Sequence, residues 1–573
     1  MTSSKLVVAA IDFGTTFSGY AFSFTHEYQS DPLKIQSNHW IGGGHMSLKA
    51  PTTVLFNPEE EFHSFGYEAE DKYSNLAEEG MHKEWFFFRR FKMLLHNNKT
   101  LTRKTILHDE HKKPLSALSV FSAAIRYLKD HLIDTLFKRV PEIRKEDIHW
   151  VLTVPAIWND SAKQFMRQAA LEADVPKENL MLALEPEAAS ILCRQLPVER
   201  IQGARLSDLG AFRPGQTYIV MDLGGGTVDI TVHAVVEDGS LTEITKASGG
   251  AWGGIQVDNS FIEFLQEIAG KTVVDEFQET NTEDYLEMMR EFEAKKRNVS
   301  LRSEGFFTLR IPISFSDIFK SKNGKSISDH IESSQYAETV RFKKDKCHFD
   351  HTIIQGFFQK SIENTIKHVR SIFQDKDIQN VHTVLMVGGF AESPIAQDSI
   401  RAAFPDKRII VPNESGLVVL KGAVLFGHNP DALQSRKSKY SYGVDVNFGP
   451  FREGFHNDAY KYYDVSSKIY RCKHVFGVFV RAGQSVPNDS TVTQTYTSTR
   501  EDVTDGIGVY ASTSEHPRYV TDADSFKLGN IYLSEVGHSV SIEMKFGGTE
   551  FSVQVVDLET REKRIDCFDF LCH

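Results

Sequence analysis

The sequence has few cysteines, and they do not cluster. Five occur among 573 residues, an odd number that a disulfide framework would not explain. Reduced thiols in the cytosol are the simple account of this pattern, so we expect a cytoplasmic protein. The five cysteines are Cys193, Cys347, Cys472, Cys567 and Cys572.

The chain also lacks an excess of positive charge and any long apolar run. It has 65 lysines and arginines against 77 aspartates and glutamates, a net charge of −12. Without a basic excess to neutralise phosphates, we expect no nucleic-acid partner. No apolar run approaches the roughly 20 residues of a membrane-spanning helix, so we expect no membrane span. The N-terminus has one cation, Lys5, before a short strand that contains Asp12, which argues against a signal peptide.

The composition is otherwise that of a large globular protein. Hydrophobic residues make up 41% of the chain and charged residues 25%, which are ordinary proportions. A chain of 573 residues is long enough for several domains with ample core.

A stretch near the middle of the chain has the features of a phosphate-binding turn. Residues 219–230 read I-V-M-D-L-G-G-G-T-V-D-I, in which an apolar run ends at Asp222 and alternating apolar residues resume after Thr227. This pattern predicts a strand, a glycine turn and a second strand. The glycines let backbone N–H groups approach a phosphate, and Asp222 could hold a phosphate-bound Mg²⁺ directly or through water. A tight hairpin that needs glycine only for its geometry is the alternative interpretation.

A second copy of the pattern decides between these interpretations. Residues 10–20 read A-I-D-F-G-T-T-F-S-G-Y, with an apolar strand that leads into Asp12. Asp12 and Asp222 are 210 residues apart, as expected for matching turns of a duplicated domain. Two such turns can hold one polyphosphate from opposite sides. Neither turn is the G-x-x-x-x-G-K-[ST] loop of the strand–loop–helix nucleotide hydrolases.

Two further charged residues lie where a phosphate site could use them. Lys92 occurs within an apolar, aromatic segment and would be a suitable point charge for a phosphate. Glu185 follows a predicted strand, where a carboxylate could orient water. The alternative for Glu185 is a helix-start carboxylate that the helix dipole favours.

A helix predicted over residues 285–301 places four polar side chains on one face. Glu293, Lys296, Arg297 and Ser300 stand at i, i+3, i+4 and i+7. An ordinary solvated face with weak ion pairs is the alternative.

A glycine corner follows later in the chain. A strand predicted over residues 381–387 ends at Gly388 and Gly389, and Ser393 and Pro394 then begin a helix. Strand, two glycines and helix form a corner that is compatible with a nucleotide. Residues 35–75, in contrast, are predicted to be mostly loop.

The pattern of the chain changes at residues 431–440, which we predict to be a polar linker. Before it, residues 1–430 are predicted to form a nucleotide-binding domain of two lobes, residues 1–215 and 216–430. After it, short alternating runs separated by turn residues predict a β-sandwich over residues 441–573.

Together these segments resemble the ATPase fold shared by actin, sugar kinases and the seventy-kilodalton heat-shock chaperones, and they are most similar to the chaperone family. Six motifs occur in the family's order. They are Ile11–Ser18 and Asp222–Asp229 for the two phosphate loops, Thr153–Ser161 and Leu184–Ala189 for the connecting segments, Glu293–Ser300 for the adenosine-contacting helix, and Met386–Pro394 for the adenine corner.

The resemblance continues weakly into the C-terminal part of the chain. Leu528–Leu533 and Phe551–Glu562 look like pieces of the chaperone peptide-binding β-domain. The helical lid of the family has no counterpart before the last residue, His573. The fold that the resemblance implies is therefore α/β, a duplicated actin-like ATPase fold with two lobes, followed by a β-sandwich without a lid.

The resemblance also implies a set of site residues for ATP or ADP with Mg²⁺. Asp12 and Asp222 would hold Mg²⁺ through its waters, and positioning and charge neutralisation would carry phosphoryl transfer. The residues implied for catalysis are Lys92, Glu185, Asp222, Thr227 and Asp229. The residues implied for nucleotide contact are Asp12, Gly14, Thr15, Thr16, Phe17, Gly224, Gly225, Gly226, Gly253, Gly254, Glu293, Lys296, Arg297, Ser300, Gly388, Gly389, Phe390 and Glu392.

The chain departs from the family pattern at several positions. Glu392 stands where the family has an arginine that stacks on adenine, which implies weaker adenine affinity. Lys163 replaces an arginine associated with signalling between domains. The polar linker replaces a short leucine-rich one. These departures resemble the atypical 12A/12B branch of the family.

The function that follows is a chaperone-like protein that binds Mg²⁺-ATP, hydrolyses it slowly, and binds polypeptide clients or co-chaperones. The first alternative is a nucleotide-sensing interaction protein with little or no turnover. The second is a small-molecule kinase of the same fold, which would need a catalytic base beside a substrate pocket and would leave the terminal β-domain unexplained.

Overall fold

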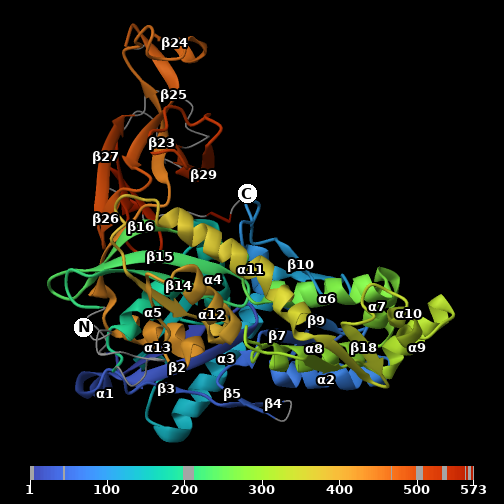
Figure 1. Cartoon of the computed structure of the whole chain (residues 1–573). Coiled ribbons are helices and arrows are strands. Elements are labelled where there is room, and N and C mark those ends of the chain that lie inside the picture. Colours follow the sequence, from blue (N-terminus) through green and yellow to red (C-terminus); the bar gives the residue numbers. More distant parts are fainter. Residues whose placement is uncertain are drawn as a thin grey trace.

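The computed structural model has two broad lobes, from which a narrow β-rich segment rises (Figure 1). Cys567, Cys572 and the last residues of the predicted motif Leu528–Leu533 lie outside the part of the chain that the structure describes. The described residues are 5–42, 45–197, 212–465, 467–497, 507–531, 539–561, 563–564 and 570–571.

The first lobe is built on a mixed sheet around the amino-terminal hairpin. The central strand, β1 (Val7–Asp12), is buried along its whole length, as its apolar sequence requires. It pairs antiparallel with β2 and parallel with β12, and the sheet order is β13-β12-β1-β2-β3, with β6 also paired to β2. The other strands are β2 (Phe17–Phe24), β3 (Gln36–Ser37), β6 (Ala50–Pro51), β12 (Ile148–Val154) and β13 (Leu180–Leu184).

The second lobe is built on a sheet of seven strands around the second predicted hairpin. The order is β21-β20-β14-β15-β16-β22-β26, and β14 pairs antiparallel with β15 and parallel with β20. The strands are β14 (Thr217–Leu223), β15 (Val228–Val235), β16 (Leu241–Gly250), β20 (Thr383–Val387), β21 (Arg408–Ile410), β22 (Leu433–Lys437) and β26 (Ser485–Pro487).

The two sheets repeat one topology. In each, an antiparallel hairpin is extended beside its first strand by two parallel strands, β12 and β13 in the first lobe and β20 and β21 in the second. Asp12 ends β1, and Asp222 lies one residue before the end of β14. The duplication predicted from the two Asp–x–Gly turns is therefore confirmed.

Two helices pack between the sheets and bring them close together. They are α5 (Glu185–Cys193) and α13 (Ser415–His428), and both are almost entirely buried. A Cβ on Gly422 of α13 would overlap the carbonyl of Ala188 on α5, so glycine is required for this approach. Small residues at the helix contact thus set the distance between the lobes.

Long helices cover the outer faces of the sheets. Phe121, Ile125, Leu128, Leu132 and Leu136 lie on one face of α3 and have no exposed surface. Asn159 caps α4, and its side chain accepts a hydrogen bond of 2.9 Å from the Ala162 backbone N–H. The helices are α3 (Ala117–Arg139), α4 (Asp160–Glu172), α11 (His351–Ile372) and α12 (Pro394–Ala403).

Each lobe also extends an arm to the right in Figure 1, and the two arms pack on each other. An ion pair of 3.0 Å joins Arg290 on the second arm to Glu70 on the first. The first arm contains α2 (Tyr67–Glu78), β7 (Thr53–Phe56), β8 (Phe62–Phe65) and β9 (Phe86–Arg89). The second contains α6 (Ile255–Ala269), α7 (Lys271–Thr280), α8 (Thr282–Lys296), α9 (Ile313–Asn323), α10 (Ile327–Glu332), β17 (Phe306–Arg310), β18 (Val340–Lys343) and β19 (Lys346–Asp350).

The prediction that residues 35–75 are mostly loop is wrong. This part of the chain contains short strands and the helix α2, which buries Ala69, Tyr73 and Leu76. The strands escape a local pattern because each is only two to four residues long, and some also have a partner that is distant in the sequence. β7, for example, pairs with β9, some thirty residues later.

The C-terminal part of the chain is made of two antiparallel sheets that share one core. Their orders are β24-β25-β23-β28-β29 and β27-β30-β31-β32. Val444 and Val509 of the first sheet and Ile542 and Met544 of the second belong to the same buried cluster. The strands are β23 (Ser441–Phe448), β24 (Lys461–Asp464), β25 (Ile469–Val480), β27 (Thr491–Thr497), β28 (Ile507–Ser512), β29 (Ser525–Ile531), β30 (Ser539–Lys545), β31 (Ser552–Asp557) and β32 (Lys563–Arg564).

The predicted linker, residues 431–440, contains a strand. β22 pairs parallel with β16 of the second lobe and antiparallel with β26, which comes from the C-terminal part. The segment therefore holds the β-rich part against the lobes. Among the described residues, no helix is long and apolar enough to cross a membrane.

Candidate functional site

The two predicted glycine turns face each other across one cavity of about 330 Å³. A Cβ on Gly225 would overlap the Thr16 hydroxyl and lie 2.9 Å from its Cγ2. A Cβ on Gly226 would lie 2.6 Å from the Thr15 hydroxyl. The turns therefore approach each other with no room for side chains on the glycines, which leaves their backbone groups open to a ligand.

Asp12 lies in the cavity wall with two partners that the sequence did not indicate. Lys49 Nζ donates to Asp12 Oδ2 at 2.6 Å, and the Thr153 hydroxyl donates to Oδ1 at 2.9 Å. Burial alone would raise the pKa of Asp12, but the charge and hydrogen bond of Lys49 lower it below its usual value. This carboxylate is therefore ionised and already neutralised by a cation.

Asp222 lies in the same cavity in a more negative setting. Burial, together with the charges of Glu185 and Asp229, raises the pKa of Asp222 well above its usual range. Lys92 Nζ donates to Glu185 Oε1 at 2.8 Å, and both side chains are buried. Burial still raises the pKa of Glu185 to about 7, against the opposing charge of Lys92.

Asp229 does not line the cavity but supports its wall. The Thr227 hydroxyl donates to Asp229 Oδ2 and the Ile157 backbone N–H donates to Oδ1, each at 2.9 Å. Burial raises the pKa of Asp229, and these two hydrogen bonds oppose the rise. The carboxyl group holds the Thr227 side chain in place on the second turn.

The charge of this site suits a divalent cation with a triphosphate. Four buried carboxyl groups, those of Asp12, Glu185, Asp222 and Asp229, face two lysines. The described residues contain no group of three or more His, Cys, Asp or Glu side chains that could hold a metal ion. A Mg²⁺ ion held by Asp12 and Asp222 would therefore keep most of its waters, as Mg²⁺ usually does.

The predicted glycines Gly253 and Gly254 lie behind the second turn and do not line the cavity. The Gly254 backbone N–H donates to Gly224 O at 3.2 Å, and the Ile255 N–H donates to Gly225 O at 2.8 Å. A Cβ on Gly253 would lie 2.6 Å from Gly224 O. These residues thus hold the turn from behind, at the start of α6.

The predicted adenosine-contacting residues separate into two groups. Arg297 lines the cavity, lies over the Phe17 ring at 4.9 Å, and pairs with Glu293 at 2.9 Å. Lys296 is buried and pairs with Asp258, so its charge is already compensated. Glu293 lines an adjoining cavity of about 410 Å³ that lies between the two arms.

Ser300 does not share a helical face with the other three. The helix α8 ends at Lys296, five residues before the predicted end. Val299 O accepts a hydrogen bond from the Ile395 N–H, and the Ser300 N–H donates to the Ser303 hydroxyl. These bonds to other parts of the chain replace the helical ones, so the prediction that residues 285–301 form one helix is wrong at its C-terminal end.

The glycine corner lines the cavity from the opposite side. Gly388 has φ of 91°, and a Cβ there would lie 2.5 Å from Leu223 O, so both its conformation and its surroundings favour glycine. Gly389 and Glu392 also line the cavity, and Glu392 Oε1 accepts a hydrogen bond of 2.9 Å from the Gly416 N–H. Phe390, in contrast, packs in the core near Phe358.

Sequence reasoning missed five residues that shape the site: Lys49, Thr153, Asp258, Gly416 and Leu417. Lys49 lies within residues 35–75, which the sequence predicts to be mostly loop. Thr153 lies in the motif T-V-P-A-I-W-N-D-S, but only the pairing of β12 with β1 brings its hydroxyl to Asp12.

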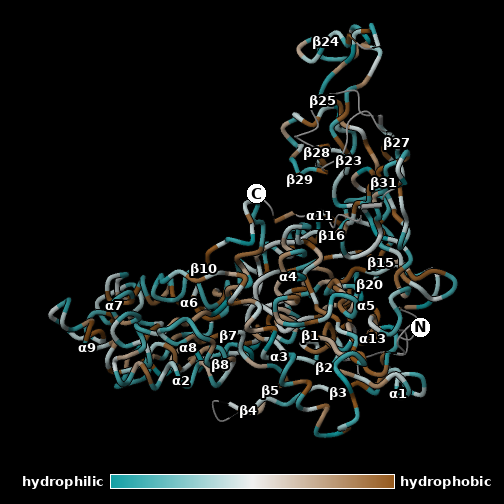
Figure 2. The backbone as a smooth tube through the Cα atoms, turned by 180° about the vertical axis from the view of Figure 1, so that it is seen from behind, coloured by the Kyte–Doolittle hydropathy of each residue, from teal (hydrophilic) through white to brown (hydrophobic). Residues whose placement is uncertain are grey.

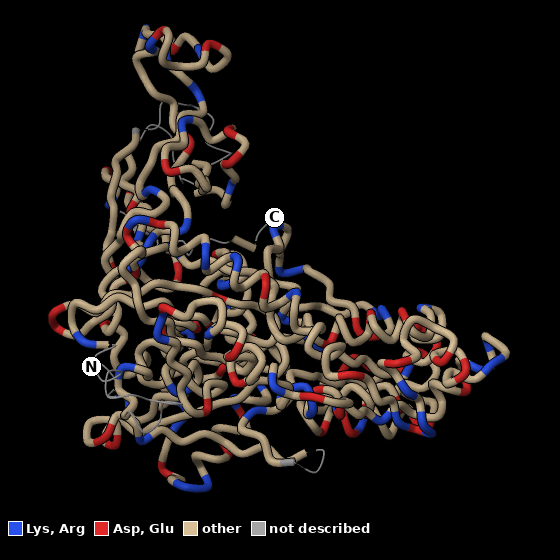
Figure 3. Tube along the Cα trace, viewed as in Figure 1, with Lys and Arg blue, Asp and Glu red and all other residues tan. Residues whose placement is uncertain are grey.

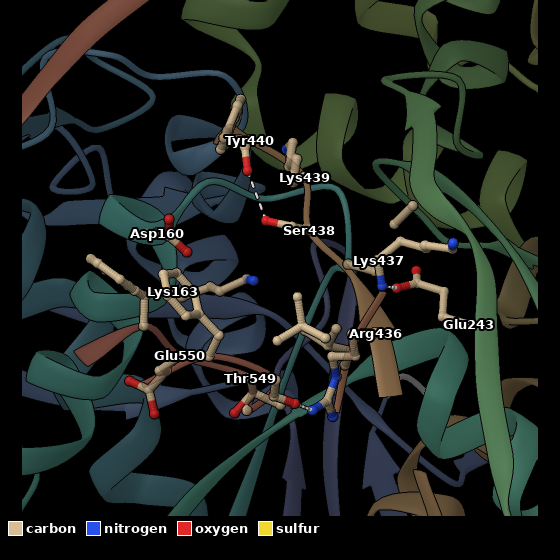
Figure 4. Close-up of a pocket in the computed structure, with 18 of the residues that line it drawn as sticks. Asp160, Lys163, Glu243, Arg436, Lys437, Ser438, Lys439, Tyr440, Thr549 and Glu550 are labelled. Carbon is tan, nitrogen blue, oxygen red and sulfur yellow. Dashed lines mark hydrogen bonds between the residues drawn. The ribbon is translucent and has the colours of Figure 1, made fainter. Parts of the chain in front are cut away.

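A small second cavity of about 100 Å³ lies where the β-rich part meets the lobes (Figure 4). Charged residues surround it, including Lys163 of α4, Glu243 of β16 and Lys437 of β22. Arg436 forms a buried two-pronged ion pair with Glu187 at 2.7 and 2.8 Å. Glu187 lies two residues after Glu185 on α5. The contact between the β-rich part and the lobes therefore begins next to the cavity between the two glycine turns (the phosphate-loop cavity).

Further bonds join the β-rich part to the first lobe. The Tyr442 hydroxyl donates to Asp160 at 2.7 Å, and Lys439 Nζ donates to the Ile157 carbonyl. Burial, together with the charge of Lys163, lowers the pKa of Lys439 to about 8. Ile157 thus contacts both parts: its N–H donates to Asp229 and its carbonyl accepts from Lys439.

The duplicated sheets, the facing glycine turns and the acids behind them define a two-lobed nucleotide-binding protein of the α/β class. The family model "Hsp70 protein" matches residues 89–429 of the chain. The human protein "Heat shock 70 kDa protein 12A" is 34% identical over 99% of this chain and 92% of its own length. The human "Heat shock 70 kDa protein 12B" has the same identity and coverage.

The chain therefore belongs to the Hsp70 family, in its atypical 12A/12B branch. A more distant relative is the "Chaperone protein DnaK" of Mycoplasmopsis synoviae, which is 23% identical over 60% of this chain and half of its own length. Membership of the family makes this a nucleotide-binding, chaperone-like protein with the actin-like ATPase fold.

Proposed function

We propose that the protein binds Mg²⁺-ATP between its two lobes and hydrolyses it slowly to ADP and phosphate. The observation that carries the proposal is the meeting of both glycine turns, Lys92 and three acids around one cavity. A triphosphate would bring negative charge to backbone N–H groups and lysines that face it.

Each residue has a proposed role. Gly224, Gly225, Thr15 and Thr16 would receive the phosphates, and Lys92 would balance their charge. Asp12 and Asp222 would hold Mg²⁺, whose charge would neutralise the phosphate oxygens when it is bound.

Glu185 is the proposed residue that accepts a proton from the attacking water. Its pKa of about 7 suits a base that works near neutral pH. Asp229 would act as a positioning residue through Thr227, which it already holds by a hydrogen bond. The glycines of the adenine corner and Arg297 would receive the nucleoside.

We further propose that residues 441–573 form a β-sandwich that binds polypeptide clients or partner proteins, with residues 431–440 as the connection. The support is the pair of sheets with a common core. A cytoplasmic location is part of the proposal, and its support is that Cys193, Cys347 and Cys472 are free and buried.

Calorimetry and steady-state phosphate release test the first proposal. We expect the full chain to bind ATP with Mg²⁺ and to release phosphate at a low rate that Asp222→Ala abolishes. Glu279→Ala, an exposed acid on α7, is the matched control and should leave the rate unchanged. No binding of ATP or ADP would refute the proposal.

The ion pair of Lys49 with Asp12 favours a second candidate, a nucleotide-sensing protein without turnover. A lysine that already neutralises Asp12 competes with a metal for the same carboxylate. Equal phosphate release by the wild type and Asp222→Ala, together with measurable ATP binding, would establish this candidate in place of the first.

A further inference from the structure

The end of the β-rich part that lies farthest from the lobes carries a concentration of exposed apolar side chains. This apical segment, residues 448–474, contains β24 and the first half of β25 and forms the top of the molecule in Figures 1 and 2. It has seven aromatic residues among twenty-seven. Five of the large hydrophobic residues that are exposed in the described chain lie here: Phe448, Phe455, Tyr463, Val465 and Tyr470.

The exposed side chains are held in place by packing beneath them. His456 is buried among the rings of Phe448, Phe451 and Phe455, at centroid distances of 5.1 to 5.8 Å. The Asn457 N–H donates to the Tyr519 hydroxyl at 2.7 Å, which ties the segment to the body of the β-rich part. The exposed rings of the apical segment therefore belong to an ordered surface.

Cations accompany the rings. Lys461 Nζ lies 4.8 Å from the Phe451 ring centroid and 5.0 Å from that of Tyr470, and Lys473 lies 5.0 Å from Tyr462. The apical segment has five lysines and arginines against three acids, in a chain whose net charge is −12 (Figure 3). The apex is thus a basic, aromatic end of an acidic protein.

We propose that the apical segment is a membrane-contact surface that inserts its exposed aromatic and aliphatic side chains into the headgroup region of an anionic phospholipid bilayer. Tyrosine rings and neighbouring lysines are the residue types that favour this interface. Lysines and arginines close to an anionic surface are attracted to it, and this attraction weakens as the salt concentration rises.

The shape of the apex favours a bilayer over a peptide. The apolar residues stand on a projecting end that can meet a flat surface, and the outer strand there, β24, is only four residues long, a short edge for a peptide to pair with. Val465, at the turn between β24 and β25, is 78% exposed and thus free to enter a soft surface. Because the apex projects away from the lobes, it can touch a bilayer while the acidic body stays in water.

Co-sedimentation of the full chain with lipid vesicles tests the proposal. We expect the protein to sediment with vesicles of phosphatidylcholine and phosphatidylserine, less with phosphatidylcholine alone, and less at high salt. Val465→Asp and Lys468→Glu should each reduce sedimentation several-fold. Ile313→Asp replaces another exposed apolar residue, on α9 and outside the apical segment, and should sediment like the wild type.

Thermal unfolding of each variant shows that it is folded, since both apical positions are exposed. Sedimentation that Val465→Asp leaves unchanged would overturn the proposal, as would no sedimentation of the wild type with either vesicle. Binding of a soluble hydrophobic peptide that is lost in Val465→Asp, without any vesicle binding, would overturn it in favour of a polypeptide partner. None of these outcomes depends on ATP turnover.

Discussion

Lys49 Nζ lies 2.6 Å from Asp12 Oδ2 inside the phosphate-loop cavity, and this ion pair joins two parts of the chain that the sequence did not connect. Asp12 ends the first strand, whereas Lys49 immediately precedes the short strand β6 that pairs with β2. The pair neutralises one of the two acids proposed to hold Mg²⁺. It therefore sets how strongly a metal must compete to enter the site.

Replacement of Lys49 by methionine is expected to destabilise the nucleotide-free protein. The change leaves Asp12 buried without its cation and should lower the free energy of unfolding by about 1–3 kcal/mol, because part of the pair is exposed. Saturating Mg²⁺-ATP should recover part of the loss, since a cation can then bind the free carboxylate. Urea denaturation with and without Mg²⁺-ATP measures both effects.

Lys49→Arg keeps the charge and is the control for this change. If the methionine variant is as stable as the wild type without nucleotide, the ion pair does not contribute as the geometry indicates.

The carboxyl group of Glu185 gives stability a specific dependence on pH. Burial raises its pKa from 4.5 to about 7, so between these values the folded protein keeps a proton that the unfolded chain has released. Stability from this group therefore falls as pH rises through that range. The side chain at position 185 does not titrate in Glu185→Gln, so the variant does not lose this stability as pH rises. The unfolding free energy of the variant minus that of the wild type should therefore increase by about 1–3 kcal/mol between about pH 5 and about pH 7.5.

Denaturation of both proteins across this pH range measures the difference, and any constant offset from the lost Lys92 partner cancels. Glu279→Gln, at an exposed position, should follow the wild type at every pH. Parallel profiles for Glu185→Gln and the wild type would contradict the raised pKa.

Gly225→Ala is expected to force the two glycine turns apart. A Cβ at this position would overlap Thr16 Oγ1 and lie 2.9 Å from its Cγ2 and 3.1 Å from its Cβ, so no rotation of Thr16 removes the clash. Overpacking of this kind costs about 1–3 kcal/mol, which corresponds to a loss of ATP affinity of roughly five-fold to a hundred-fold if the turns must meet to bind phosphate. Titration calorimetry with Mg²⁺-ATP measures the loss.

Gly356→Ala serves as the control, because a Cβ there has no neighbour within 4 Å and the residue lies in α11. Undiminished ATP affinity in Gly225→Ala would show that the turns do not hold the phosphates together.

The buried ion pair between Arg436 and Glu187 is expected to hold the β-rich part on the lobes. Arg436→Met should leave the Glu187 carboxylate buried and uncompensated, at a cost of about 3–5 kcal/mol of unfolding free energy. The double variant Arg436→Met/Glu187→Gln removes both charges and should recover most of that loss. Denaturation of the two variants beside Glu187→Gln alone completes a double-mutant cycle.

Limited proteolysis gives an independent measurement of the same pair. We expect faster cleavage within residues 431–440 in Arg436→Met than in the wild type, because β22 is held less firmly. Equal cleavage rates would mean that the pairing of β22 with β16 and β26 holds the segment without the ion pair.

Local patterns in the sequence are sufficient to identify the two hairpins and the first-lobe acid Asp12 with its counterpart Asp222. Alternating and continuous apolar runs determine which strands are buried, and glycines after an acid mark turns that must admit a ligand. These are properties of neighbouring residues, so no long-range contact is needed to predict them. The family's motifs, in their order, then indicate the two-lobed fold.

Only the folded chain decides which distant groups meet. Thr153 and Lys49 reach Asp12 because β12 pairs with β1 and β6 pairs with β2. Arg436 reaches Glu187 because β22 pairs with β16 of the second lobe. The end of α8 at Lys296 likewise depends on Val299 bonding to α12. Such contacts are set by packing between elements, and their energies are not encoded in the pattern of any single segment.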